Sequence, residues 1–156
     1  MHTTLKTRTA GSGPNLVLLH GWGVNSGVWQ PIATQLQQHF SVTYVDLPGF
    51  GENNQIMPKP YDLKNLAECV ANVLPQNSVL AGWSLGGLVA QHVALLEPTN
   101  VKQLVLIATS PKFQKGSDWA GIDPNILQAF SQQLVKNLSK TIEPWAAIQR
   151  KWILKK

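Results

Sequence analysis

The sequence has 156 residues, of which 44% are apolar, and a formal net charge of +5, which suffices for the core of a single domain. No window reaches the roughly 18 apolar residues of a membrane span, and the first six residues lack the apolar core of a signal peptide, so we expect a soluble protein. The lone cysteine, Cys69, cannot form an intramolecular disulfide. This fits a reducing cytoplasm, although many exported proteins also lack disulfides.

The positive charge is concentrated in the last third of the chain. Residues 1–111 hold five Lys or Arg and five Asp or Glu, which cancel. After Ser110 there are eight basic and three acidic residues, a balance that suits an acidic partner but is also typical of a solvated helical face. The sequence has no helix-turn-helix, zinc or single-strand-binding signature, so we do not expect nucleic acid to be that partner.

Short apolar runs alternate with stretches of helical spacing up to about residue 110. The runs, which we expect to be buried strands, are 16–19, 42–45, 79–81 and 104–107, and the helical stretches are 32–40, 63–74 and 85–96. Strands without polar alternation are typical of parallel sheets covered by helices on both faces. The sequence therefore predicts an α/β fold with a mostly parallel sheet and right-handed crossovers.

The pattern changes after Ser110, where residues 122–138 and 142–154 have helical spacing with no strand between them. This predicts a helical cap and not a second sheet. We expect a core over residues 1–110, a partial cap over 111–149 and a tail over 150–156.

The clearest chemical motif is Gly82-Trp83-Ser84-Leu85-Gly86, placed where an apolar strand gives way to a helix. A serine on a tight strand-to-helix turn exposes its hydroxyl at the carboxyl end of the sheet, and flanking glycines let the backbone close that turn. The amide of Leu85 lies at the helix start, where unpaired N–H groups can stabilise an oxyanion. We predict that Ser84 is a catalytic nucleophile.

A second motif, His20-Gly21-Trp22-Gly23, directly follows the first apolar run. It should emerge at the same sheet edge as Ser84, so the amide of Trp22 can act as the second oxyanion donor. His20 has two interpretations, a catalytic base or a side chain that braces the glycine-rich loop through hydrogen bonds. We favour the brace.

The other titratable candidates receive structural interpretations. Asp46 precedes Ser84, whereas the nucleophile of this kind of fold comes first, followed by the acid and then by the histidine. His92 lies eight residues into the helix after Ser84, His2 and His39 have no motif around them, and Cys69 has the spacing of a core residue. We predict no metal and no cofactor, because the sequence shows neither a metal-ligand cluster nor a phosphate-binding glycine loop.

Together these motifs resemble a known family. Residues 16–23, 45–51, 82–89 and 110–122 are similar to the pimeloyl-[acyl-carrier protein] methyl ester esterases of biotin synthesis, which are α/β-hydrolases, and the similarity runs to about Gln149. The resemblance implies that Ser84 attacks the methyl ester of a pimeloyl chain carried on acyl carrier protein, releasing methanol. It also implies that Trp22 and Leu85 line the acyl site.

The predicted cap receives further roles from the same resemblance. Five cap residues would contact the pimeloyl chain near its ester: Trp145, Ala146, Ala147, Ile148 and Gln149. Lys140 matches a basic position that docks the acidic carrier protein, whereas Pro144 stands where another basic residue is expected. We expect a monomer that does not bind membranes.

The resemblance stops before the family's later acid and histidine, which an activated serine requires. A truncated or frameshifted reading frame is the simplest hypothesis, and we expect this chain alone to be a poor esterase. One alternative is that a histidine within the chain replaces the base. Two others are a hydrolase of small free esters and an inactive module that binds the acyl group or the carrier.

Overall fold

The computed structural model describes residues 4–137, 140 and 143. The chain divides into two compact units, Met1–Pro111 and Lys112–Lys156.

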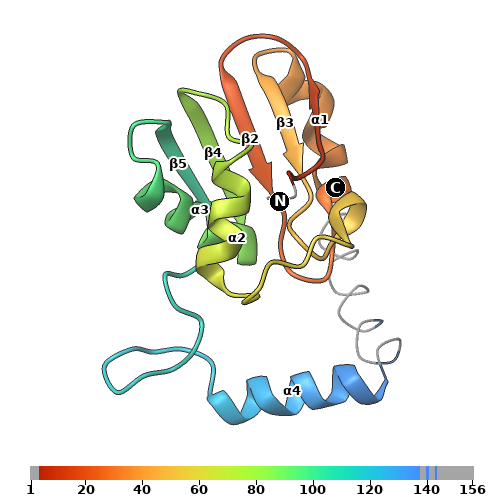
Figure 1. The fold of residues 1–156 in the computed structure, drawn as a ribbon, viewed down its shortest axis with the longest axis vertical. Coiled ribbons are helices and arrows are strands. Elements are labelled where there is room, and N and C mark those ends of the chain that lie inside the picture. The colour runs from red at the N-terminus through yellow and green to blue at the C-terminus, as the bar shows by residue number, and fades with distance from the viewer. Residues whose placement is uncertain (1–3, 138–139, 141–142, 144–156) are drawn as a thin grey trace. The chain divides into compact units, whose positions relative to one another are not determined.

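The first unit is built on a five-stranded sheet (Figure 1). Its strands, in the spatial order β1-β3-β2-β4-β5, are β1 (Thr7–Ala10), β2 (Asn15–Leu19), β3 (Ser41–Val45), β4 (Ser78–Trp83) and β5 (Val101–Ile107). β2 pairs in parallel with β3 and β4, and β4 pairs in parallel with β5, which confirms the predicted mostly parallel sheet. The exception is β1, which runs antiparallel to β3.

Two expectations about strands were wrong. Sequence patterning missed β1, because its residues Thr-Arg-Thr-Ala are all exposed and offer no apolar run. The last run was expected to be a buried strand, yet six of the seven residues of β5 are exposed. The reason is that β5 is an edge strand in the described sheet.

Helices cover the two faces of the sheet unequally (Figure 1). On one face, α2 (Leu63–Ala71) and α3 (Leu85–Leu96) pack against a buried cluster that includes Val17, Leu19 and Leu80. On the other face, α1 (Gln30–Gln37) and the preceding 3₁₀ helix η1 (Ser26–Trp29) pack on Leu16, Leu18 and Val42. Alternate residues of the inner strands β2, β3 and β4 thus contribute to opposite cores, as the pleat requires.

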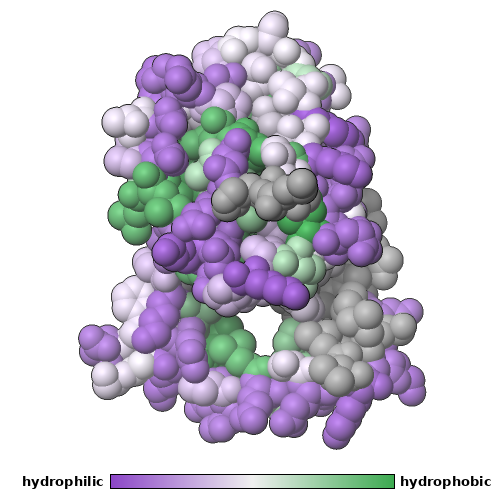
Figure 2. Space-filling view, in the orientation of Figure 1, coloured by the Kyte–Doolittle hydropathy of each residue, from purple (hydrophilic) through white to green (hydrophobic). Residues whose placement is uncertain are grey.

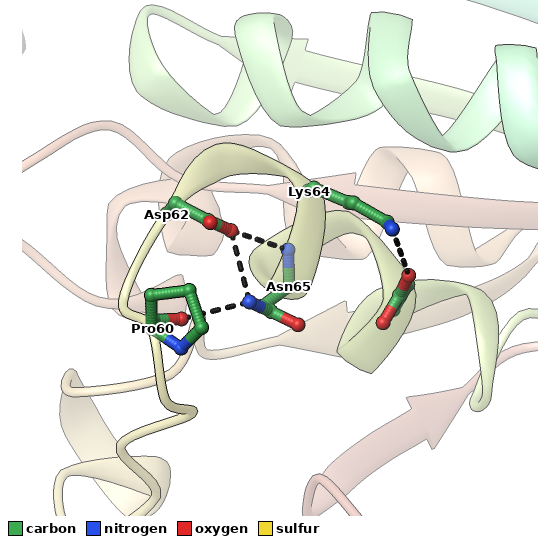
Figure 3. Close-up of polar contacts among 5 residues, drawn as sticks. Pro60, Asp62, Lys64 and Asn65 are labelled. Atoms are coloured by element: carbon green, nitrogen blue, oxygen red, sulfur yellow. Dashed lines mark hydrogen bonds and ion pairs between the residues drawn. The ribbon is translucent and has the colours of Figure 1, made fainter.

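Local capping defines the start of α2 (Figure 3). Asp62 Oδ1 accepts the backbone amide of Asn65 at 2.9 Å, and the Asn65 side chain donates to the carbonyl of Pro60, also at 2.9 Å. A cap of this kind contributes about 1 kcal/mol. Within α2, Lys64 and Glu68 form an exposed ion pair at 3.8 Å, which adds little stability.

The second unit contains α4 (Pro124–Lys136), whose start is capped by Asp123 Oδ1 accepting the amide of Asn125 at 2.8 Å. Before α4, the chain forms a small loop closed by an isolated bridge between Gln114 and Ile122. α4 confirms a helix within the predicted stretch 122–138. The predicted helix 142–154 lies outside the described residues, apart from residue 143. Within the part of the chain that is described, no helix has the length and apolar character needed to cross a membrane.

Candidate active site

Ser84 lies on a sharp turn between the last residue of β4, Trp83, and the first residue of α3, Leu85. Its backbone has φ 53° and ψ −116°, a conformation that residues other than glycine rarely adopt. Two contacts hold it in place: the amide of Ser84 donates to the carbonyl of Ile107 at 2.9 Å, and Thr109 Oγ1 donates to the carbonyl of Ser84 at 2.7 Å. Such strain persists only where the surroundings fix it, and it is typical of functional sites.

Close backbone contacts explain the glycines on either side of Ser84. A Cβ atom at Gly82 would collide with the carbonyl oxygen of Gly86, and one at Gly86 would collide with the carbonyl oxygens of Leu19 and His20. The start of α3 therefore lies directly against the carboxyl end of β2. Only residues without a side chain permit this approach.

The same packing brings the loop after β2 to Ser84. A Cβ atom built on Gly21 would lie 3.4 Å from the Cβ of Ser84 and 3.0 Å from the ring of Trp83. The structure thus brings together Ser84 and the glycine-rich loop that contains Trp22, while Leu85 begins α3 without a side-chain cap. The role of the Trp22 and Leu85 amides as oxyanion donors stays a prediction.

His20 is fully buried, and both of its ring nitrogens have partners. Nε2 accepts the amide of Leu47 at 2.9 Å, which leaves Nδ1 to donate to the carbonyl of Gly21 at 2.7 Å. Burial lowers the pKa of His20, against smaller raising effects from the Gly21 carbonyl and from the charge of Asp46. These contacts fit the predicted brace and leave neither nitrogen for the Ser84 hydroxyl.

Asp46 organises the loop after β3. Its carboxylate accepts the amide of Ser26 at 2.6 Å and the amide of Glu52 at 2.9 Å, and its side chain is buried. Burial on its own would raise the pKa of this carboxyl, but the hydrogen bonds from Glu52 and Ser26 outweigh it, so the pKa is lowered. The contacts fit the predicted structural role.

Among the described residues, the side chains of the remaining candidates form no hydrogen bond with Ser84. His92 Nδ1 is 3.2 Å from the carbonyl of Leu88 within α3, and His39 is exposed. Cys69 packs against the core under α2 and α3, where burial raises the pKa of its thiol, as does the neighbouring charge of Glu68. His2 lies outside the described residues. The structure, as far as it describes the chain, has no group of three possible metal ligands.

Of the predicted cap residues, Lys140 is described. It is exposed, and its amide donates to Asn137 Oδ1 at 3.2 Å. The predicted pimeloyl contacts Trp145, Ala146, Ala147, Ile148 and Gln149 lie outside the described residues.

Sequence reasoning missed the residues that support Ser84 from behind. Ile107 and Thr109 hold its backbone from the end of β5 and the loop that follows. The available signal was their position, at the end of the last predicted strand and in the loop directly after it. Pairing of β4 with β5 brings the two carboxyl ends together.

The comparisons with known proteins agree with this geometry. A family model described as the alpha/beta hydrolase fold matches residues 14–154. The chain belongs to the α/β-hydrolase fold family. This α/β-hydrolase is 93% identical over 149 residues to a protein of Pseudoalteromonas atlantica named pimeloyl-[acyl-carrier protein] methyl ester esterase. It is 47% identical over 149 residues to a protein of the same name from Vibrio campbellii.

Each of these two alignments covers 96% of the chain and 58% of the relative, so the chain spans little more than half the length of the proteins it matches. A solved esterase from Exiguobacterium antarcticum superposes with a TM-score of 0.85 at 24% identity, covering 92% of this chain and 56% of that one. That likeness shows the shared fold.

Proposed function

We propose that Ser84 is the nucleophile of a carboxylic ester hydrolase. The observation that carries this proposal is the strained backbone of Ser84 at the start of α3, in contact with the Gly21 loop. A serine with a purely structural role does not require a positive φ. A nucleophilic serine does, because the sharp turn with this φ exposes its hydroxyl to the substrate. The family and the relatives' names support the same chemistry.

In the proposed reaction, Ser84 Oγ attacks the ester carbonyl and its proton passes to a base, giving a tetrahedral intermediate whose oxyanion is held by the amides of Trp22 and Leu85. Collapse expels the alcohol, which takes up the proton, and water then hydrolyses the acyl-enzyme to the free acid. His20 and His92 are held by other contacts. We therefore assign the base and its carboxylate to the part of the relatives that this chain does not cover.

The substrate we propose is the methyl ester of pimeloyl-[acyl-carrier protein], on the strength of the relatives' names. The pimeloyl chain would run along residues Trp145–Gln149, and the acidic carrier would dock near Lys140. The excess of basic residues after Ser110, eight against three acidic ones, supports docking of an acidic carrier on this part of the chain. We propose that the protein acts as a monomer in the cytoplasm, in keeping with its single cysteine.

A second candidate applies to this chain by itself: an inactive module that binds the acyl group or the carrier. The occupied ring nitrogens of His20 favour it, because they leave that histidine unable to deprotonate Ser84. For the whole protein, the alternative is a hydrolase of small free esters. A comparison of carrier-bound and free methyl esters as substrates distinguishes it from the carrier-bound esterase.

The deciding experiment uses a full-length protein carrying these residues. Ser84→Ala should lower kcat on a short chromogenic ester by about three orders of magnitude or more, because a triad nucleophile has no substitute. Ser12→Ala, at an exposed position outside the site, is the matched control and should leave kcat unchanged. Retention of most activity by Ser84→Ala would remove the assignment.

The carrier-bound methyl ester and its free methyl ester analogue are then compared at two salt concentrations. The carrier-bound substrate should have the higher kcat/KM, and the advantage should shrink as salt shortens the screening length from ~10 Å at 0.1 M to ~3 Å at 1 M. Equal kcat/KM values for the two substrates at low salt would favour a hydrolase of small free esters.

A further inference from the structure

A pocket of ≈ 290 Å³ opens beside the β1 edge of the sheet, on the face that carries α1. Its lining residues come from β1, β3, η1 and α1. The polar members are Arg8, Ser26, Gln30, Thr34, Gln37 and Tyr44. None of these residues belongs to the Ser84 site, and among the residues that the structure describes no acidic side chain lines the pocket.

The α1 side of the pocket is polar where a helix packed on a sheet is usually apolar. Gln30, Ala33, Thr34 and Gln37 line it, and their spacing of i, i+3, i+4 and i+7 places them on one face of the helix. Only the small Ala33 among them is buried. The stripe therefore offers hydrogen-bonding groups to the pocket and does not close it with apolar side chains.

Arg8 is held over the pocket by two contacts. It lies directly opposite Tyr44 in the β1–β3 register, with its guanidinium carbon 5.9 Å from the centre of the Tyr44 ring. Its Nη2 donates to Ser26 Oγ at 3.0 Å, and Ser26 is itself fixed by the hydrogen bond from its backbone amide to Asp46 Oδ1. Among the described residues Arg8 forms no ion pair. Most of the five N–H donors of its guanidinium therefore remain for a ligand.

Tyr44 adds a second donor. Its hydroxyl oxygen accepts Gln37 Nε2 at 2.9 Å, so its own proton is left to point elsewhere. The ring is almost fully buried, at 8% exposure, which fixes the position of the hydroxyl. The guanidinium of Arg8 and the hydroxyl of Tyr44 thus both offer hydrogen-bond donors at this pocket.

We propose that this pocket is a binding site for a small carboxylate. Arginine pairs with carboxylates through two parallel N–H bonds in one plane, and the Tyr44 hydroxyl would donate to the same group. A single cation and a pocket of this size favour a short monocarboxylate over a phosphate, which usually meets more than one positive group or a cluster of amides. The proposal is independent of the reaction at Ser84.

The test titrates butyrate into the 156-residue chain and follows backbone amide shifts by NMR. Butyramide, which has nearly the same shape and no charge, is the control ligand. Butyrate should bind in the millimolar range and shift amides of β1, β3 and α1, whereas butyramide should bind at least about tenfold more weakly, because a charge-assisted pair is lost. Inorganic phosphate is the third probe and should bind more weakly than butyrate.

Two variants assign the binding to the pocket. Arg8→Gln should weaken butyrate binding about tenfold or more, and Arg8→Lys, which keeps the charge but loses the planar fork, should weaken it by a smaller factor. Lys6→Gln removes an equal charge two residues away, outside the lining, and should bind butyrate as the parent does. Circular dichroism checks that each variant keeps the parental fold.

Three outcomes would overturn the proposal: butyrate causing no shifts at these residues, butyramide binding as well as butyrate, or Arg8→Gln binding as well as Lys6→Gln. Tighter binding of phosphate than of butyrate would reject the carboxylate assignment and identify a general anion site.

Discussion

The two edges of the sheet have opposite character. β1, at one edge, has four residues of which none is large and apolar, and its cation Arg8 lies against Tyr44 of the neighbouring strand. β5, at the other edge, exposes Leu104, Val105, Leu106 and Ile107 at 37–45%. Figure 2 shows apolar surface on the side where β5 and the end of α3 lie, and Leu95 of α3 is 78% exposed.

β1 is suited to be an exposed edge strand, and β5 is not. Natural edge strands are short and carry charges, because unpaired backbone groups beside apolar side chains invite pairing with other chains. β1 follows that pattern, whereas β5 has the length and composition of an interior strand. Relatives that extend well beyond the matched region have further chain available to cover this edge.

The first prediction tests that contrast with one charge at each edge. Val105→Lys, in β5, should markedly raise the fraction of this chain that remains monomeric, because a lysine on an exposed apolar edge opposes association. Thr9→Lys, in β1, is the matched control and should change that fraction little. Size-exclusion chromatography with light scattering measures both. If the two lysines had equal effects, association would not depend on the β5 edge.

The second prediction concerns the buried carboxylate of Asp46, which accepts the amide of Ser26, the residue that Arg8 of β1 contacts. Asp46→Asn should lower the free energy of unfolding at neutral pH by about 2 kcal/mol, because two amides lose a charged acceptor. The folded pKa of Asp46 lies below its unfolded value. Its contribution is therefore complete above the unfolded pKa of ~3.9 and is lost as pH falls through the folded pKa.

Urea unfolding of the parent and Asp46→Asn at several pH values measures this contribution. The stability difference between them should shrink in acid. A difference that stays constant down to the most acidic pH would show that the carboxylate is not the group responsible. Asp62→Asn keeps a capping side chain on an exposed turn and serves as the control.

Much of the core and the site could be predicted because the relevant signals are local. Four apolar runs gave the parallel strands, and the strand-turn-helix context of Ser84 located the turn that the structure shows. β1 has no such signal, since its place depends on pairing with β3, more than 30 residues away in the chain. The Arg8 pocket escaped prediction for the same reason, because its members are brought together by that pairing and by α1.

The third prediction separates His20 from Asp46 by its pH range. Burial lowers the pKa of His20, so folding favours the neutral ring. Its stability contribution is complete above the unfolded pKa of ~6.5 and falls as pH drops from there toward the folded pKa. The parent should therefore lose stability below pH ~6.5, before Asp46 titrates, and His20→Gln should flatten this part of the pH profile. His39→Gln, at an exposed site, is the matched control substitution. A profile unchanged by His20→Gln would assign the loss to another group.

The fourth prediction concerns the contribution of Arg8, on the β1 edge, to the stability of the fold. Arg8→Gln removes the contact with the Tyr44 ring and the hydrogen bond to Ser26. It should lower the free energy of unfolding by only about 1 kcal/mol, because Arg8 is exposed and water partly solvates each contact. Lys6→Gln, which removes the same charge without these contacts, should change it by less than about 0.5 kcal/mol. If Arg8→Gln also left the monomeric fraction unchanged while Val105→Lys raised it, charge on β1 would serve ligand binding and local stability, and the tendency to associate would belong to β5. If Arg8→Gln instead promoted association as strongly as Val105→Lys opposes it, both edges would depend on charge for solubility, and the contrast between them would be one of degree.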